Sequence, residues 1–431
     1  MAGETRLVLA GDVMTGRGVD QVLPHPGDPT LHERWVADAR TYVHLAEKRN
    51  GAVPRPVDPR WPWGETLEVM DAFGPAVRVM NLETSVTTCD EVAEGKAVHY
   101  RMSPDNVACL TVAGADVWTL ANNHLLDHGV AGLRETLEAL RSAGLRYAGA
   151  GLDEPEAWEP AAVGPPGHRV VVCSVGHASS GVPWRWAAGP GRPGVAVLPD
   201  LSTATADALA ARLRQAGGPG DLRVVSVHWG GNWGYDVPRD QRRFAHRLLD
   251  GGVHLVHGHS SHHPRPVEVH DGKAVLYGCG DLVNDYEGID GFEEYRGELR
   301  LVYLVRLDVG SGELVDLTMV PFRAHRLSLR RASREDASWL AGVQEPAQDP
   351  QRVLLVAGPP ELLGELVEPE PCLLAALLDQ RDFGCRLDGH LLETPPHLHA
   401  RRGRTTRHGP MVPGPGPERL SRPGARASRP R

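Results

Sequence analysis

Short apolar runs alternate along the chain with longer segments in which apolar residues recur every three or four positions. A short apolar run predicts a buried strand, and the recurrence of three and four predicts a helix. Strands are predicted at residues 5–11, 77–83, 116–121, 169–175, 222–227 and 253–257. Helices are predicted at residues 65–74, 104–114, 129–144, 203–216 and 239–251. Two segments rich in glycine, proline and tryptophan are interpreted as a long excursion and a loop, residues 24–64 and 176–200.

The alternation of strands and helices stops after residue 266, where predicted strands follow one another without helices between them. Asp271-Gly272 between two apolar runs predicts a hairpin. A second hairpin is predicted from residues 299–308 and 314–322, around Gly310. Alternating strands and helices followed by antiparallel strands predict two packed sheets with helices outside, an α/β fold.

The pattern weakens after about residue 340. Residues 395–431 contain nine arginines and a single acid, Glu418, among many prolines and glycines. Such a segment cannot bury enough apolar surface to order itself. The sequence therefore predicts one domain over residues 1–330, a weakly structured extension over 331–394 and a disordered tail over 395–431.

Composition restricts the classes of function. The formal net charge of −9 and the low aromatic content of 5% argue against a nucleic-acid partner. The six cysteines are scattered without close pairs, so we expect reduced thiols. The N-terminus has no basic segment followed by a long apolar one, and no run approaches the ~20 apolar residues of a membrane helix. We therefore expect a cytoplasmic protein without a transmembrane segment.

Polar side chains that can bind metals follow five of the predicted strands. The densest group is the segment His254–Pro264, which holds five histidines in ten positions. Because strand ends meet at one edge of an α/β sheet, we expect these side chains to converge. The candidate ligands are Asp12, Glu83, Asn123, His228, His259 and His262, and His124 lies beside Asn123.

Two carboxylates, an amide oxygen and three imidazoles suit a hydrolytic centre with two divalent ions. A carboxylate can bridge the ions, which polarise a phosphoryl or acyl oxygen and lower the pKa of a bound water. An uncoordinated histidine nearby can protonate the leaving group. A purely structural, histidine-rich strand end is the alternative. His254 and His257 are interpreted as core or supporting groups, and His263 as a residue at the rim.

The motifs occur in an order that resembles a known family. They are Gly11-Asp12-Val13-Met14 with Arg17, Asn81-Leu82-Glu83, Ala121-Asn122-Asn123-His124 with Asp127 and Gly129, His228-Trp229-Gly230, Gly258-His259-Ser260-Ser261-His262 and Tyr277-Gly278-Cys279-Gly280-Asp281. Over about residues 5–325 the chain resembles the CapA family of poly-γ-glutamate or capsule biosynthesis proteins, which is related to calcineurin-like metallophosphoesterases. The resemblance implies a four-layer α/β/β/α sandwich of two mixed sheets.

The resemblance also implies a role for each motif. Asp12 would be the first metal-binding aspartate, and Glu83 would take the place of the bridging aspartate. The amide ligand would be Asn123, and the histidine ligands would be His228, His259 and His262. His124 would donate a proton as a catalytic residue, and Arg17 would hold an anionic group. Asp281 and Asn284 are interpreted as supporting groups.

Two departures from the phosphoesterase pattern bear on the function. Met14 stands where a histidine is usual, and one extra residue separates His259 from His262, so one metal position is short of a ligand. We therefore keep two hypotheses. The first is a metal-dependent hydrolase that binds one or two ions of manganese, iron or zinc and acts on a phosphoester or γ-glutamyl substrate. The second is a non-catalytic component of a polymer synthase that binds a polyanion or glutamate. The sequence leaves the oligomeric state open.

Overall fold

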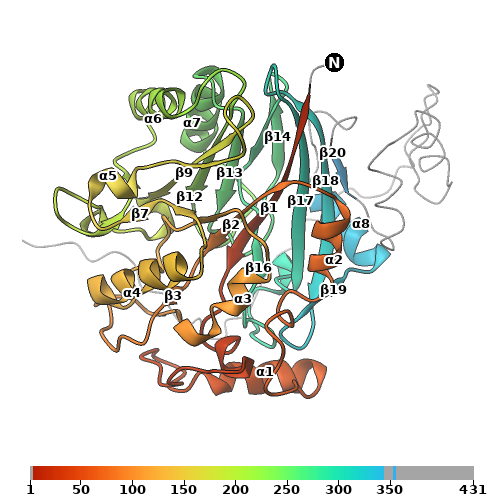
Figure 1. Ribbon diagram of the computed structural model, residues 1–431. Helices are drawn as coiled ribbons and strands as arrows, with labels where there is room; N and C mark the ends of the chain where they lie inside the picture. Colours follow the sequence, from red (N-terminus) through yellow and green to blue (C-terminus); the bar gives the residue numbers. More distant parts are fainter. Residues whose placement is uncertain (1–2, 344–352, 356–431) are drawn as a thin grey trace, which may run out of the picture. The chain divides into compact units, whose positions relative to one another are not determined.

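Two mixed β-sheets pack face to face in this computed structural model, which describes residues 3–343 and 353–355 (Figure 1). Within those residues, nine strands form the first sheet and seven form the second. The first sheet contains β19 (Leu329–Arg331), β18 (Leu314–Ala324), β17 (Leu299–Asp308), β1 (Glu4–Val13), β2 (Val77–Leu82), β5 (Val117–Thr119) and β6 (Tyr147–Ala148), with β16 (Asp281–Val283) beside β1 and β20 (Val353–Leu355) beside β18. The second contains β11 (Val197–Leu198), β9 (Val170–His177), β12 (Leu222–His228), β13 (Leu255–His259), β15 (Lys273–Leu276) and β14 (Val267–His270), with β8 (Ala161–Val163) beside β9.

The remaining elements are two small strand pairs and the helices. The pairs are β3 (Ser85–Val86) with β4 (Arg101–Met102) and β7 (Ala150–Gly151) with β10 (Gly194–Val195). The helices of the described residues are α1 (Arg40–Asn50), α2 (Thr66–Ala72), α3 (Ala108–Thr111), α4 (Gly129–Ser142), α5 (Glu154–Ala157), α6 (Thr203–Ala216), α7 (Arg239–Asp250) and α8 (Arg334–Val343). Figure 1 shows α6 and α7 side by side next to the strands of the second sheet.

Successive side chains of a strand point to opposite faces of its sheet. The apolar residues of one strand therefore pack into two different layers. In β1, Leu7 and Leu9 belong to a buried cluster shared with β9, β12 and β13 of the second sheet. Val8 and Ala10 belong instead to a cluster shared with α2 and α4. A third cluster joins the other face of β9 and β12 to α6 and α7. The order of layers is helices, sheet, sheet, helices, which confirms the predicted α/β/β/α sandwich.

Most predicted strands and helices are present, and the differences have local causes. The excursion predicted over residues 24–64 contains the helix α1, whose buried residues Tyr42, Val43 and Ala46 stand among charged neighbours that obscure the helical spacing. The helix predicted over 104–114 is a short 3-10 turn followed by α3. Of the predicted extension over 331–394, the structure describes residues 331–343, which include α8, and residues 353–355, which form β20. The predicted tail, residues 395–431, lies outside the described part of the chain.

The carboxyl ends of the central strands meet between the two sheets. Strands β1, β2 and β5 run parallel to one another, as do β9, β12 and β13. The His257 ring nitrogen Nε2 lies 2.9 Å from the carbonyl oxygen of Ala10 and so links β13 to β1. A Cβ atom at Gly11 would lie 1.8 Å from the Gly280 carbonyl oxygen, so only glycine permits this approach of β1 to the chain before β16. The His257 side chain and the close backbone approach at Gly11 therefore hold the strand ends at fixed spacing.

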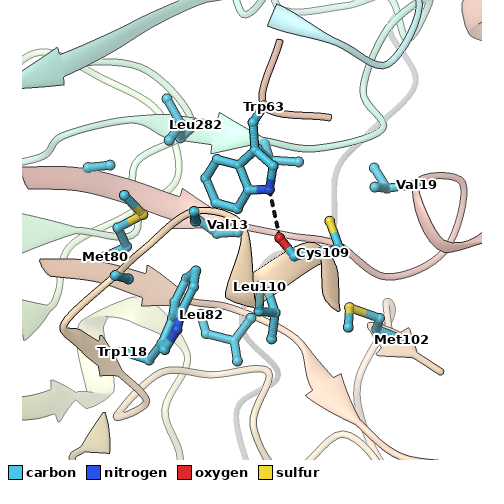
Figure 2. Packing of buried hydrophobic residues seen from close by; sticks show 14 of the residues in the cluster. Val13, Val19, Trp63, Met80, Leu82, Met102, Cys109, Leu110, Trp118 and Leu282 are labelled. Carbon is cyan, nitrogen blue, oxygen red and sulfur yellow. Dashed lines mark hydrogen bonds between the residues drawn. The ribbon is translucent and has the colours of Figure 1, made fainter. Parts of the chain in front are cut away.

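Trp63 is the centre of the apolar layer beneath the first sheet. Figure 2 shows its ring among Val13, Leu110 and Leu282, with Trp118 nearby. The side chain is fully buried, and its indole N–H donates to the carbonyl oxygen of Cys109 at 2.8 Å. This bond satisfies a buried carbonyl at the helix α3 and ties the helix to the segment that precedes α2.

Trp63→Phe should lower the free energy of unfolding by about 1–3 kcal/mol, because the Cys109 carbonyl loses its donor in a site that water cannot reach. Urea denaturation followed by circular dichroism measures the change. Trp35→Phe is the matched control, since Trp35 is 83% exposed, and should change the free energy by less than about 0.5 kcal/mol. Equal effects of the two substitutions would contradict the role given to the indole N–H.

Candidate metal centre

Two buried carboxylates lie at the ends of neighbouring strands. Asp12 is the penultimate residue of β1, and Glu83 follows β2 directly. Both are almost completely inaccessible to solvent. Asp12 accepts hydrogen bonds from the Asn81 side-chain amide at 2.7 Å and from the Ser260 backbone N–H at 3.0 Å. Glu83 Oε2 has no hydrogen-bond partner among the described residues.

Two histidines of the second sheet face these carboxylates. His228 ends β12 and His259 ends β13, and the two residues are in register as neighbours. Their Nδ1 atoms lie 2.8 Å apart and within 3.9 Å and 3.7 Å, respectively, of Asp12 Oδ1. His228 Nε2 lies 2.9 Å from the Asn123 amide oxygen and 3.7 Å from Glu83 Oε1. One cluster therefore contains five of the six predicted ligands.

The surrounding polar groups orient these imidazoles. The Ser226 hydroxyl lies 2.9 Å from His259 Nε2 and 3.1 Å from His257 Nδ1. Ser226 precedes His228 by two residues on β12, so both side chains project toward the same face of the sheet. The amide of Asn122 donates to the Leu82 carbonyl at 2.7 Å, which ties the turn after β5 to the end of β2. Such outer contacts fix the direction of a ligand's lone pair.

The electrostatics of the cluster fit a bound cation. Burial and the neighbouring Asp281 raise the pKa of Asp12 to about 7, and burial together with Asp12 raises the pKa of Glu83 well above its ordinary value. Burial also lowers the pKa of His228 and of His259 well below the usual range, so both rings are neutral. Neutral imidazoles and carboxylates without a counter-charge are the donors that Mn²⁺, Fe²⁺ or Zn²⁺ accept. The unpartnered Glu83 oxygen is a further donor, so the residues present fit a divalent ion.

His124 lies beside the cluster and is held by a carboxylate. Its Nδ1 lies 2.6 Å from Asp127 Oδ2, and its Nε2 lies 3.7 Å from Glu83 Oε1. Lys96 contacts Asp127 and the Asn123 carbonyl oxygen, and its ammonium lies 3.2 Å from His124 Nδ1. Burial lowers the pKa of His124 to about 4, although Asp127 opposes this shift. The ring would therefore need an additional negative charge near Nε2 to hold a second proton.

His262 is paired with a different carboxylate. Its Nδ1 lies 3.0 Å from Asp281 Oδ1, and its Nε2 lies 3.0 Å from the Asn232 side chain. Burial lowers the pKa of His262, but Asp281 and Asp12 together raise it, and the net shift is upward. Asn284 donates to Asp281 Oδ2 at 2.7 Å and accepts from Arg300 at 2.8 Å. His262 thus borders the cluster on the side of Asp12, without a direct contact to His228 or His259.

Arg17 lies in a separate polar network. Its guanidinium donates to Asp285, at 3.1 Å through Nε, and to Glu33 at 2.9 Å. It also stacks over the Tyr42 ring, with 3.8 Å between the guanidinium carbon and the ring centroid. The adjacent Tyr100 ring packs against His124, with 4.3 Å between ring centroids. The structure therefore places Arg17 one residue removed from His124, with its donors directed at carboxylates of the protein.

Three further residues near the cluster pack among aromatic side chains. Trp229 is fully buried, and its indole N–H donates to the Tyr277 carbonyl at 3.0 Å, so it belongs to the core. Trp233 stacks on Phe292 with 4.1 Å between ring centroids. His263, interpreted as a rim residue, is fully buried and stacks against Tyr295, so that interpretation is wrong. The packed aromatic side chains of neighbouring loops, which sequence spacing cannot reveal, cover it.

Sequence reasoning missed Lys96 and Ser226. A period-two pattern in β12 links Ser226 to His228 and could have identified it. Lys96 stands alone in a loop with no pattern, and only the folded chain shows that it reaches Asp127. Of the cysteines in the described residues, Cys89, Cys109, Cys173 and Cys279 are free thiols, as predicted, and Cys372 and Cys385 lie outside those residues.

Comparisons with known proteins identify a matching family model, related sequences and a similar solved structure. A family model described as bacterial capsule synthesis protein PGA_cap matches residues 6–286. A probable polyglutamine synthesis accessory protein of Mycobacterium tuberculosis is 50% identical over 369 residues, which cover 84% of this chain and 97% of that protein. The PGA biosynthesis protein CapA of Bacillus subtilis is 24% identical over 262 residues, covering 59% of this chain and 66% of that protein. Among solved structures, a phosphatase of Mycoplasma pneumoniae matches with a TM-score of 0.41 at 12% identity, covering 78% of this chain and 96% of that one.

The raised pKa of Asp12 predicts a pH-dependent stability of the metal-free protein. A carboxyl whose pKa rises on folding favours the folded state below its unfolded pKa, and this stabilisation is lost as the pH rises through the folded value. Asp12→Asn removes the titration. From about pH 5 to about pH 8, the wild type should lose on the order of 2–3 kcal/mol relative to the variant.

Urea denaturation of both proteins in a chelator measures this difference. Asp71→Asn changes an exposed carboxylate and serves as the control, with no comparable change across the same pH range. A difference between wild type and Asp12→Asn that does not vary with pH would refute the prediction.

Proposed function

Because the chain belongs to the CapA (PGA_cap) family of bacterial capsule synthesis proteins, we propose that it is a metal-dependent hydrolase acting on a phosphoester or γ-glutamyl bond during the synthesis of capsule or poly-γ-glutamate. The observation that carries the proposal is the buried cluster of Asp12, Glu83, His228 and His259. Its two carboxylates have no cationic side chain bonded to them. Burial of such charges costs several kcal/mol unless a cation compensates them.

The residues divide into those that would hold metal and those that would act on the substrate. Asp12, Glu83, Asn123, His228 and His259 are the proposed ligands of the first ion, with His262 beside them. When bound, a divalent ion would polarise the substrate oxygen and lower the pKa of a water molecule. No metal identity is assigned beyond manganese, iron or zinc.

His124 is the proposed proton donor to the leaving group. Asp127 fixes its Nδ1 and favours the protonated ring, and an anionic substrate beside Nε2 would strengthen that preference. Lys96 opposes it but balances the charge of Asp127. In this arrangement His124 acquires its proton most readily when substrate is present. Arg17 stays a proposed contact for an anionic group only if a substrate displaces one of its carboxylate partners.

A binding role without catalysis is the second candidate, and Met14 favours it. The Met14 side chain is buried and supplies no imidazole where phosphoesterases have a histidine. The pocket would then hold a polyanion or glutamate for a polymer synthase. In the residues that the structure describes, no helix combines the length and apolar character needed to cross a membrane.

Glu83→Ala and His228→Ala should each lower hydrolysis by at least about 100-fold in protein loaded with Mn²⁺, because each removes a proposed ligand. The assay uses p-nitrophenyl phosphate, bis-p-nitrophenyl phosphate and poly-γ-glutamate as alternative substrates. His44→Ala, on the exposed side of α1, is the matched histidine control and should keep wild-type activity. Equal activity in all four proteins would remove the support for a metal-dependent reaction, and bound metal without turnover on any substrate would favour the binding role.

His124→Gln should distinguish a proton donor from a group that only shapes the pocket. A general acid contributes about 10²–10⁴-fold when the leaving group is a poor one. The variant should therefore lose that factor with an alkyl phosphate and less than about tenfold with p-nitrophenyl phosphate, whose leaving group needs no proton. Steady-state kcat values for the two esters provide the measurement. A loss of the same size for both esters would argue against proton donation by His124.

A further inference from the structure

Two tyrosine side chains from distant segments of the chain meet beside the candidate metal centre. Tyr100 directly precedes β4, Tyr286 follows β16, and their hydroxyl oxygens lie 2.5 Å apart. The Tyr100 ring packs edge-to-face against His124. The Tyr286 ring packs in the same way against His262, with 5.1 Å between ring centroids. The tyrosine pair therefore connects the two histidines that border the cluster.

The two phenols contain one more O–H group than their shared hydrogen bond uses. One hydroxyl donates to the other, and neither has a further hydrogen-bond partner among the described residues. Tyr100 is 1% exposed, whereas Tyr286 is partly exposed. A buried O–H without an acceptor is unfavourable, so the spare O–H belongs on the more accessible residue. Tyr100 therefore donates to Tyr286, and the Tyr286 O–H is left to donate to a ligand.

Arg17 strengthens these donors without taking their place. Its guanidinium carbon lies 4.6 Å from the centroid of the Tyr100 ring and 5.7 Å from that of the Tyr286 ring. A nearby cation favours negative charge on a phenol oxygen, which makes the O–H a stronger hydrogen-bond donor. Both phenols still keep their protons at neutral pH, because burial raises the pKa of each above its ordinary value.

We propose that the Tyr286 hydroxyl, oriented by Tyr100, donates a hydrogen bond to an anionic oxygen of the substrate at the candidate metal centre. The oxygen belongs to a phosphoryl group or to a carboxylate, and either is the charged acceptor that the spare O–H requires. The inference rests on the proposed function and adds a binding residue to it. The contact with an anionic group that was expected of Arg17 is made instead by a tyrosine beside it, because the donors of Arg17 are bonded to protein carboxylates.

Anion binding tests the proposal without turnover. Protein loaded with Mn²⁺ is titrated with inorganic phosphate and, separately, with γ-glutamylglutamate, and isothermal titration calorimetry gives the dissociation constants. Wild type should bind at least one of the two probes. Tyr286→Phe removes the hydroxyl and keeps the ring, so it should weaken binding by at least about 10-fold, as expected for a lost hydrogen bond to a charged group. The probe whose binding weakens identifies the oxygen as phosphoryl or carboxylate.

Tyr147→Phe is the matched control, because it removes a hydroxyl that donates to Glu156 outside the cluster, and it should bind the probes as the wild type does. Tyr100→Phe leaves the Tyr286 O–H in place but removes the group that orients it. This second variant should weaken binding by less than Tyr286→Phe, and it tests the pair even if Tyr286→Phe does not fold. Elemental analysis reports the metal content of each protein, and circular dichroism reports its folding.

The outcomes separate this inference from the proposed function. A Tyr286→Phe protein that holds metal and binds both probes within about threefold of the wild type would overturn the inference and leave the hydrolase proposal standing. Metal-loaded wild type that binds neither probe would also overturn it, as would an equal loss of binding in Tyr147→Phe. A wild type that takes up no metal would remove the proposed metal centre, and the inference with it.

Discussion

The burial of acidic side chains at the meeting point of two sheets is the constraint around which this protein is arranged. Asp12 and Glu83 place two carboxyl groups in a region that solvent hardly reaches. Within the residues that the structure describes, the surrounding chain provides hydrogen-bond donors and no cationic side chain to Asp12: the Asn81 amide and the Ser260 N–H donate to it directly. Neutral histidines from the opposite sheet complete the enclosure. Glu83 Oε2 has no hydrogen-bond partner among the described residues, and the proposed ion would compensate it.

Two histidine–carboxylate pairs flank this region and differ in their electrostatics. In the pair of His124 and Asp127, Lys96 joins the carboxylate and burial keeps the imidazole neutral. In the pair of His262 and Asp281, no lysine intervenes, and the carboxylate raises the pKa of the imidazole. The same pair of residue types therefore has different protonation behaviour in the two places, because the neighbouring groups differ. Under the proposed function the first pair would move a proton, whereas in the second pair the imidazole itself balances the charge of the carboxylate.

Much of the fold could be predicted from the sequence because strand and helix periods are local properties. The apolar runs of β1, β9 and β12 and the spacing in α6 and α7 identify the elements, and the polar residues after the strands identify Asp12, Glu83 and His228, which the fold brings into one cluster. Contacts between distant segments could not be predicted. The contact of Lys96 with Asp127 joins a patternless loop to a turn, and the pairing of Asp12 with Asp281 joins residues from opposite ends of the domain. The helix α1 was missed because only a narrow face of it is apolar.

The close approach of Gly11 to Gly280 has a consequence for how this protein can change over evolutionary time. Two backbones touching without side chains between them act as a spacer of constant length, so the separation of Asp12 from Asp281 does not depend on the size of any core residue. Packing elsewhere, such as the layer around Trp63, can then drift while the acidic positions keep their mutual distance. Stability and site geometry become separately adjustable quantities, and a chain built in this way can tolerate extensive replacement of its interior before its chemistry is altered.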